Sequence, residues 1–443
     1  MYDLLLRHPF MSAEGLAATR DTALIAAMRE VELALASEQE ALGLLPPGSA
    51  EAMARHLGDE AFDSRALADG TLKGGNAAIP FVKQARAALP DELKSCFHQG
   101  ATSQDILDSA LMLLLKPRLE RCLALLERSR AAGCALMREH RDTPMVGRTL
   151  MQQALPITFG AKVAHWLHGL HQAERRLAEV VAQGLYVQFG GAVGVHSGLD
   201  EHGLALMDGL AGRLGLNAPL LPWHTDRQPV LALGGALDAV AAGAEKIALD
   251  VSLLCQTEVG ELSEPAEAGV GESSSMPHKR NPVGCARIRA AARQIHGHAG
   301  MLSHTAAQPL ERGLGEWHAE WAPLVDAALL LEGALESLAA LLEGLEVHRE
   351  AMLRNLAITG GAIMAEPAAR ALTPALGSDA AKRVAREAAD TARREGHEYA
   401  EALLAHTAVK GRVDAEALRA AIQPDLYIGS SRAQVERALK ALE

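Results

Sequence analysis

Residues 269–282 combine hydroxyl, cationic and turn-forming side chains in one short stretch, which reads GVGESSSMPHKRNP. Its early glycines and its two prolines exclude a continuous helix. Three consecutive serines are followed by three basic residues, His278, Lys279 and Arg280. A glycine hinge next to serines suits a mobile lid whose backbone N–H groups line an anion site. The alternative is a polar surface loop whose serines only cap neighbouring elements.

The order of residues in this stretch favours the catalytic interpretation. From Ser273 to Pro282 the chain matches Ser-Ser-x-Met-Pro-x-Lys-x-Asn-Pro in full, and in this it resembles the fumarase/aspartase superfamily. Two more segments resemble active-site segments of that superfamily, residues 100–105 (GATSQD) and residues 147–156 (GRTLMQQALP). The resemblance implies an all-α, three-domain enzyme that removes a proton next to a carboxylate and then expels a group from the adjacent carbon.

Within the superfamily, three further segments resemble the bacterial 3-carboxy-cis,cis-muconate cycloisomerases. They are residues 74–80 (GGNAAIP), 222–227 (PWHTDR) and 311–321 (ERGLGEWHAEW). This resemblance implies the interconversion of 3-carboxy-cis,cis-muconate and 4-carboxymuconolactone in the protocatechuate branch of the β-ketoadipate pathway. The partner would then be a small tricarboxylate.

The superfamily resemblance assigns the role of the base to Ser273. A serine hydroxyl is a poor base unless its alkoxide is stabilised, which Lys279 and the loop amides could do. Lys279 and Asn281 could also hold the carboxylate whose negative charge grows as the intermediate forms. The candidate substrate-binding residues are Thr102, Ser103, Arg148, Thr149, Gln152, His224, Met276, His278 and Arg280. We expect neither a metal ion nor an organic cofactor.

Leu150 stands where superfamily members that eliminate an amine or water usually carry a histidine. An amine or hydroxide leaving group needs protonation by a general acid, whereas a lactone opens by expelling a carboxylate. A carboxylate is already stable as an anion near neutral pH, so the acid can be absent. Leu150 therefore favours a cycloisomerase over fumarase or argininosuccinate lyase.

Two alternatives remain. The first is a carbon–nitrogen lyase similar to adenylosuccinate lyase. Residues 276–282 of this chain also resemble the loop of that enzyme. That family usually has a histidine near Asn76, and it has phosphate-binding residues where this chain has Trp317 and Trp321. The second alternative is a catalytically inactive protein on the same scaffold, against which the intact Ser273 and Lys279 argue.

Composition limits the class of protein without indicating a function. The chain has 443 residues, 49% of them apolar, only 3% aromatic, and a formal charge of −12. The charge argues against nucleic acid and anionic membranes as partners. Five cysteines without CxxC spacing argue against a disulfide scaffold or a zinc site. With no membrane-length apolar run and no signal-peptide pattern at the start, we expect a cytoplasmic protein.

Apolar spacing predicts long helices that position these segments. Two unbroken heptad stripes cover residues 233–254 and 324–345. Further long helices are expected from Ser103 to about His140, bent or interrupted at Pro117, and from Pro156 to Gln183. Residues 263–284 are expected to form a loop, with a new helix starting at Asn281 and Pro282.

We therefore predict three segments: an N-terminal helical domain (1–100), a central helical bundle (101–350) and a C-terminal helical domain (351–443). A continuous helical array without domain boundaries is the alternative. The superfamily resemblance also implies a homotetramer with active sites shared between subunits. Stripes of such length predict partner helices beyond one chain. Most of the 18 histidines are expected at the surface, although His98 adjoins the first active-site segment.

Overall fold

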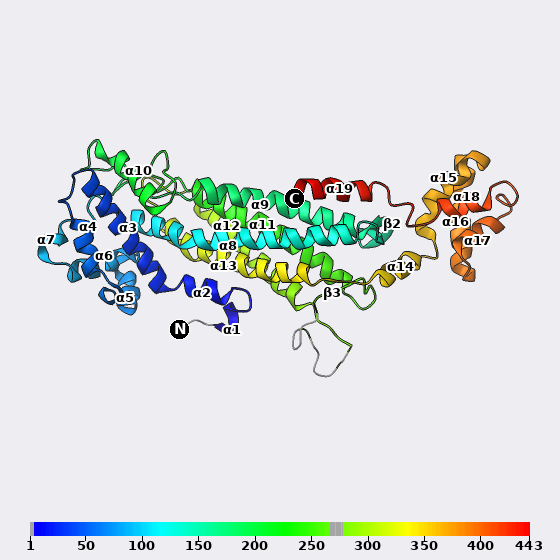
Figure 1. Cartoon of the computed structure of the whole chain (residues 1–443), viewed down its shortest axis with the longest axis horizontal. Coiled ribbons are helices and arrows are strands. Elements are labelled where there is room, and N and C mark those ends of the chain that lie inside the picture. The colour runs from blue at the N-terminus through cyan, green and yellow to red at the C-terminus, as the bar shows by residue number, and fades with distance from the viewer. Residues whose placement is uncertain (1–3, 266–270, 272–275, 277) are drawn as a thin grey trace. The chain divides into compact units, whose positions relative to one another are not determined.

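Alanine and leucine favour helix, and the sequence, which is rich in both, forms helices along most of the chain. The computed structural model describes residues 4–265, 271, 276 and 278–443. Its described part is mostly helical, with four short strands, so the all-α class is confirmed (Figure 1). The longest helices are α8 (Ser103–Glu139), α9 (Phe159–Gln183), α11 (Gln228–Leu254), α12 (Val283–Thr305) and α13 (Glu316–Glu343).

Shorter helices precede, separate and follow these long ones. Before residue 100 they are α1 (Leu4–Arg7), α2 (Ala13–Ala18), α3 (Asp21–Ala41), α4 (Ser49–His56), α5 (Ser64–Gly74), α6 (Ala78–Ala88) and α7 (Asp91–Lys94). Later ones are α10 (His202–Leu214), α14 (Arg349–Ala357), α15 (Ala365–Leu376), α16 (Ser378–Glu395), α17 (Tyr399–Ala405), α18 (Ala415–Ala421) and α19 (Ser431–Leu442). Among the described residues, no helix is both long and apolar enough to span a lipid bilayer.

The two heptad stripes form helices as predicted, and both are buried within the chain. Every stripe residue of α11, from Leu233 to Leu254, is buried, and so is every stripe residue from Leu324 to Leu345 along and just beyond α13. Burying such side chains stabilises the fold by about 1.5–3 kcal/mol each. Because the stripes are already covered, they offer no exposed apolar face and do not by themselves argue for a tetramer. Helix α8 also continues through Pro117, so of the two effects predicted for this proline the interruption is absent and the bend stays a prediction.

The segment after α8 differs from the prediction of a loop followed by a helix at Pro156. Strands β1 (Pro144–Thr149) and β2 (Gln152–Thr158) form an antiparallel hairpin, and α9 starts only at Phe159. The two turn residues, Leu150 and Met151, have left-handed φ angles of 49° and 65°. Apolar residues without glycine rarely occupy such a turn, which is why the sequence did not reveal the hairpin.

Helix α12 begins where Asn281 and Pro282 predicted, but its N-terminus is capped by another residue. The carboxylate of Glu264 accepts hydrogen bonds from the backbone N–H groups of Gly284 (2.9 Å) and Cys285 (2.7 Å). The Asn281 side chain instead donates to the carbonyl of Gly271 at 3.1 Å. The two-residue strands β3 (Leu262–Ser263) and β4 (Glu346–Val347) pair beside this helix start. A carboxylate at a helix N-terminus also complements the helix dipole.

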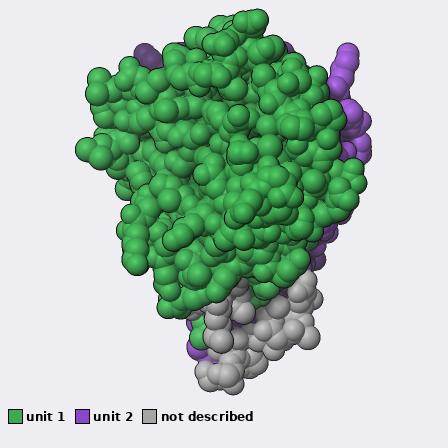
Figure 2. Space-filling model, turned by 90° about the vertical axis from the view of Figure 1, so that its left-hand side faces the viewer, with its two compact units in different colours: residues 1–126, 172–245, 287–337 green, residues 127–171, 246–286, 338–443 purple. Residues whose placement is uncertain are grey.

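The chain divides into two compact units, each made of three stretches. Unit 1 comprises residues 1–126, 172–245 and 287–337, and unit 2 comprises residues 127–171, 246–286 and 338–443 (Figure 2). The predicted central segment, residues 101–350, contributes to both units. The division into three domains at residues 100 and 350 stays a prediction.

Candidate active site

The first active-site segment lies at the N-terminus of α8 in unit 1, where Asp105 organises it. The carboxylate of Asp105 is fully buried and accepts hydrogen bonds from the backbone N–H groups of Thr102 and Gly191, both at 2.9 Å. Its other oxygen lies 2.6 Å from Nε2 of His224. Gly191 has a φ of 71°, which glycine adopts readily. Asp105 thus connects three separate segments around Thr102 and Ser103.

His224 was predicted to bind substrate, and the structure places it next to the first segment. Its side chain is only 4% exposed and faces Asp105. Its backbone carbonyl accepts a hydrogen bond from Nε2 of Gln104 at 2.9 Å. These contacts give His224 a role in holding residues 222–227 against α8, while substrate binding by its ring stays a prediction.

A buried ionic cluster lies one turn further along α8. The Arg227 guanidinium pairs with Asp108 at 2.8 Å and with Glu320 at 2.7 Å. The indole N–H of Trp317 donates to Asp108 at 2.9 Å. Burial raises the pKa of Glu320, although hydrogen bonding and attraction from Arg227 oppose the rise. A buried arginine between two carboxylates joins α8, residues 222–227 and α13, and removing one member would leave an uncompensated charge.

Two polar contacts position the hydroxyl groups of the first segment. The side-chain amide of Asn76 donates to Oγ of Ser103 at 3.3 Å, and its Oδ1 accepts from the backbone N–H of Ala78, the first residue of α6. Nη1 of Arg312 donates to Oγ1 of Thr102 at 2.9 Å. Arg312 was not among the predicted site residues, although it lies within residues 311–321. Only its approach to Thr102, 210 residues away in sequence, reveals it.

His98, which precedes the first segment and is partly buried, pairs with the buried Glu32. Its Nδ1 lies 2.6 Å from the Glu32 carboxylate. Burial lowers the pKa of His98, but attraction and hydrogen bonding from Glu32 outweigh it, so the pKa is raised overall. The left-handed φ of 61° at His98 turns the chain sharply before Thr102.

The second segment is the β1–β2 hairpin in unit 2. The guanidinium of Arg148 forms a bidentate pair with the buried Glu261, at 2.7 and 3.0 Å, and Asn355 donates to the same carboxylate at 2.7 Å. Thr149 and Gln152 face each other across the turn, and both are exposed. The tip therefore presents two polar side chains beside Leu150, which is 96% exposed.

The described part of the signature loop lines a cavity of about 490 Å³ in unit 2. The lining includes His278, Lys279, Arg280 and Asn281 together with residues 255–257 and 263–265. Arg280 pairs with Glu346 at 2.9 and 3.0 Å. No carboxylate of the described residues lies within ion-pairing distance of Lys279. Ser273 lies outside the described residues, and Met276 is exposed.

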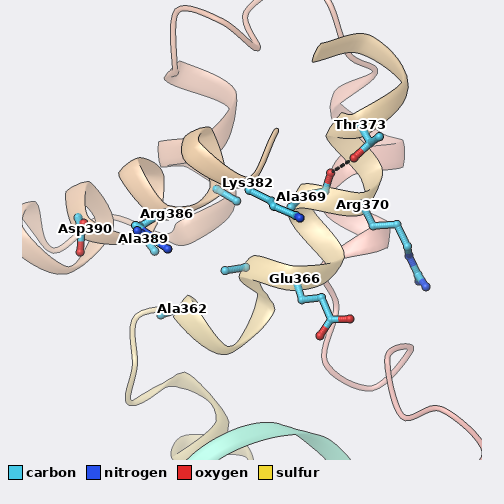
Figure 3. A pocket seen from close by; sticks show the side chains of 11 residues that line it. Ala362, Glu366, Ala369, Arg370, Thr373, Lys382, Arg386, Ala389 and Asp390 are labelled. Atoms are coloured by element: carbon cyan, nitrogen blue, oxygen red, sulfur yellow. Dashed lines mark hydrogen bonds between the residues drawn. The ribbon is translucent and has the colours of Figure 1, made fainter. Parts of the chain in front are cut away.

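A second groove in unit 2 contains none of the predicted site residues. It lies between α15 and α16, and Figure 3 shows its lining residues. Five of its eleven lining residues are alanines, and Glu366, Lys382 and Arg386 are among the charged ones. The hydroxyl of Thr373 donates back to the Ala369 carbonyl at 2.8 Å, as in an ordinary helix. This groove is not part of the candidate active site.

The predicted residues thus fall into three groups. Thr102, Ser103 and His224 come together in unit 1. In unit 2, the hairpin carries Arg148, Thr149 and Gln152, and the signature residues from His278 to Asn281 line the loop cavity.

Comparison with known proteins agrees with the signature. The lyase family model matches residues 76–297, and the model for the C-terminus of adenylosuccinate lyase matches residues 361–438. A nitrosuccinate lyase from Streptomyces davaonensis is 41% identical over 96% of this chain and 91% of its own length. A 3-carboxy-cis,cis-muconate cycloisomerase from Pseudomonas aeruginosa is 39% identical over 97% of this chain and 94% of its own length.

The fold agrees as closely as the sequence. The crystal structure of a 3-carboxy-cis,cis-muconate lactonizing enzyme from Pseudomonas putida superposes with a TM-score of 0.93, at 34% identity over 99% of both chains. Signature loop, active-site segments, fold and full-length similarity all point the same way. The chain belongs to the fumarase/aspartase superfamily of lyases and cycloisomerases.

Proposed function

We propose that this enzyme interconverts 3-carboxy-cis,cis-muconate and 4-carboxymuconolactone. The observation that carries the proposal is the full-length similarity, in sequence and in fold, to cycloisomerases of this substrate. The reaction would place the enzyme in the protocatechuate branch of the β-ketoadipate pathway. A cytoplasmic location goes with that role.

In the lactone-opening direction, Ser273 takes the proton from the carbon next to a carboxylate. The electron pair of the broken C–H bond moves towards that carboxylate, whose charge increases. Lys279, which no described carboxylate neutralises, and Asn281 stabilise this charge. The pair then forms the carbon–carbon double bond as the lactone C–O bond breaks, and the ring oxygen leaves as a carboxylate. Lactone formation is the same sequence in reverse.

Leu150 supports this chemistry because it provides no acid at the hairpin tip. Its side chain is apolar and exposed, next to Thr149 and Gln152. A departing carboxylate requires no proton near neutral pH. An amine would require one, which weighs against a carbon–nitrogen lyase.

The adenylosuccinate lyase alternative finds support in the match to residues 361–438 and little support in unit 1. That family has a histidine near the position of Asn76. Here the Asn76 amide forms hydrogen bonds with Ser103 and with the first residue of α6. Trp317 is 3% exposed and donates to Asp108, so it belongs to the buried cluster and is not placed to bind a phosphate.

A nitrosuccinate lyase activity is the stronger second candidate, because the similarity to that relative is equally extensive. Nitrite would be the leaving group from nitrosuccinate, and it is also a stable anion. Leu150 therefore does not separate the two reactions. The number of substrate carboxylates does: a nitrosuccinate carries two, and 3-carboxymuconate carries three.

A direct comparison of substrates tests the proposal. We expect kcat/KM for 3-carboxy-cis,cis-muconate to exceed that for nitrosuccinate and for adenylosuccinate by at least about a hundredfold, because buried polar groups that a wrong substrate leaves unpaired discriminate at least this strongly. A higher kcat/KM for nitrosuccinate would replace the proposed reaction by nitrite elimination. A higher value for adenylosuccinate would restore the carbon–nitrogen lyase.

We also propose a homotetramer in which subunits share active sites. The hairpin tip supports this, because Leu150 and Met151 are 96% and 71% exposed in a turn that strains both. Strained, exposed apolar residues next to predicted site residues suit a contact with another subunit.

A further inference from the structure

The guanidinium of Arg312 lies beside the first active-site segment in unit 1 and donates a hydrogen bond to Thr102. The two arginines predicted to bind substrate, both in unit 2, are paired: Arg148 with Glu261 and Arg280 with Glu346. Within the described residues, no carboxylate lies within ion-pairing distance of Arg312. Its side-chain hydrogen bond, to Thr102, goes to a neutral hydroxyl.

Arg312 is nevertheless held firmly in place. Its Cζ lies 5.8 Å from the ring centre of Trp317, within the range of a cation–π contact. Trp317 is itself fixed by its hydrogen bond to Asp108. Thr102 is fixed by Asp105. Arginine carries five N–H donors in a rigid fork, so one contact to Thr102 leaves the others available.

Burial makes this arrangement costly without a ligand. Arg312 is half-buried, and burial lowers its pKa despite attraction from the more distant Asp105 and Asp108. A group that is desolvated and paired only with a neutral hydroxyl gains from an incoming anion. A second unused donor lies close by. The indole N–H of Trp321, whose ring packs against Trp317 at 4.9 Å, is buried without an acceptor among the described residues.

We propose that Arg312 binds a substrate carboxylate beside Thr102 and Ser103, and that this carboxylate is the one that distinguishes a tricarboxylate from a dicarboxylate. Arg312 lies outside residues 76–297, the part that matches the general lyase family. The residues proposed for the common proton abstraction, Lys279 and Asn281, lie inside it. Arg312 therefore suits a carboxylate particular to this substrate. The inference rests on the proposed function in that the substrate is a tricarboxylate.

Calorimetric titration of non-reacting ligands tests this without turnover. The ligands are tricarballylate, with three carboxylates, and glutarate, the same carbon chain without the central one. The proteins are the wild type, Arg312→Met, Arg312→Lys and Arg293→Met. Arg293 is an exposed arginine of unit 1 that pairs with Glu245 outside the candidate site, so its variant controls for the loss of one positive charge.

We expect the wild type to bind tricarballylate at least about tenfold more tightly than glutarate. Arg312→Met should weaken tricarballylate binding by about tenfold to a hundredfold, the range of one charge-assisted contact, and change glutarate binding by less than about threefold. Arg312→Lys should retain part of the difference, because it keeps the charge and loses the fork. Arg293→Met should match the wild type.

Three results would overturn the inference. The wild type could bind tricarballylate no more tightly than glutarate, or the Arg312→Met variant could keep the wild-type preference for tricarballylate. In the third, Arg312→Met would weaken the binding of both ligands equally. The last result would mean that Arg312 only holds Thr102 in place. Retained glutarate binding shows that the variant's site is folded. Failure of the proposed function is distinguishable, because it appears as absent turnover of 3-carboxymuconate while the Arg312-dependent binding preference persists.

Discussion

At the scale of the residue, Asp105 shows how one buried carboxylate arranges a site. It accepts the amides of Thr102 and Gly191 and faces His224. The sequence placed Thr102 and His224 among the candidates through their motifs. It could not pair them, because 119 positions separate Asp105 from His224 and each pairing depends on tertiary packing. The same applies to Arg312 and Thr102.

Replacing Asp105 by Asn should lower both stability and activity. An amide offers one acceptor oxygen in place of two, so it loses part of this hydrogen-bonding set, at a cost of about 1–3 kcal/mol. Urea unfolding would show the lower free energy of unfolding, and kcat/KM should fall as Thr102 loses its position. Asp208→Asn, at an exposed position of α10, is the matched control and should leave both quantities unchanged. An Asp105→Asn protein with wild-type stability would contradict this role.

The pair of His98 and Glu32 predicts a pH dependence of stability. Glu32 raises the folded-state pKa of His98 over the opposition of burial. The stabilisation is therefore fully present below the unfolded pKa of about 6.5 and is lost as the pH rises through the folded pKa. We compare the wild type with His98→Asn, since asparagine tolerates the left-handed φ. The difference in free energy of unfolding should be larger at pH 6 than at pH 9. An equal difference in the free energy of unfolding at pH 6 and pH 9 would show that the His98–Glu32 pair makes no ionic contribution to stability.

At the scale of the element, the apolar periodicity of the sequence predicted the long helices, whereas the turn residues did not predict the β1–β2 hairpin. The heptad stripes of α11 and α13 predicted two long helices, and Asn281 with Pro282 predicted the start of α12. The β1–β2 hairpin was missed because Leu150 and Met151 give none of the usual signals of a two-residue turn. Local propensity is overridden here by strand pairing.

The hairpin turn predicts a trade between stability and function. Changing Leu150 to Asn and Met151 to Gly should relieve the backbone strain of two left-handed residues. This strain costs about 1 kcal/mol or more for each residue. We expect a higher urea midpoint for unfolding of the chain, together with weaker subunit association in sedimentation measurements. The opposite result is a lower urea midpoint together with unchanged subunit association. It would show that contacts within the chain stabilise the hairpin tip.

At the scale of the whole molecule, sharing of active sites between subunits is the least accessible property from one sequence. The heptad stripes suggested partner helices, but they are buried inside the chain. The exposed hairpin tip is the feature that now supports an assembly.

Mixing two inactive variants tests this sharing. Ser273→Ala and Thr102→Val each disable one segment, and we expect each alone to have little activity. If the two segments of a site come from different subunits, co-refolded mixtures should regain about a quarter of the wild-type activity, because random assembly restores that share of sites. Activity that stays at the level of the separate variants would place both segments in one subunit.

The central claim is that Ser273 drives proton transfer on 3-carboxy-cis,cis-muconate, and its ultraviolet absorbance tests this directly. Lactone formation removes the conjugated diene, so the wild type should abolish the diene absorbance. Ser273→Ala should slow this loss by about a thousandfold or more, as expected for removal of a group that transfers the reacting proton. Equal rates for both proteins would assign the proton transfer to another residue. No loss with either protein would contradict the proposed substrate.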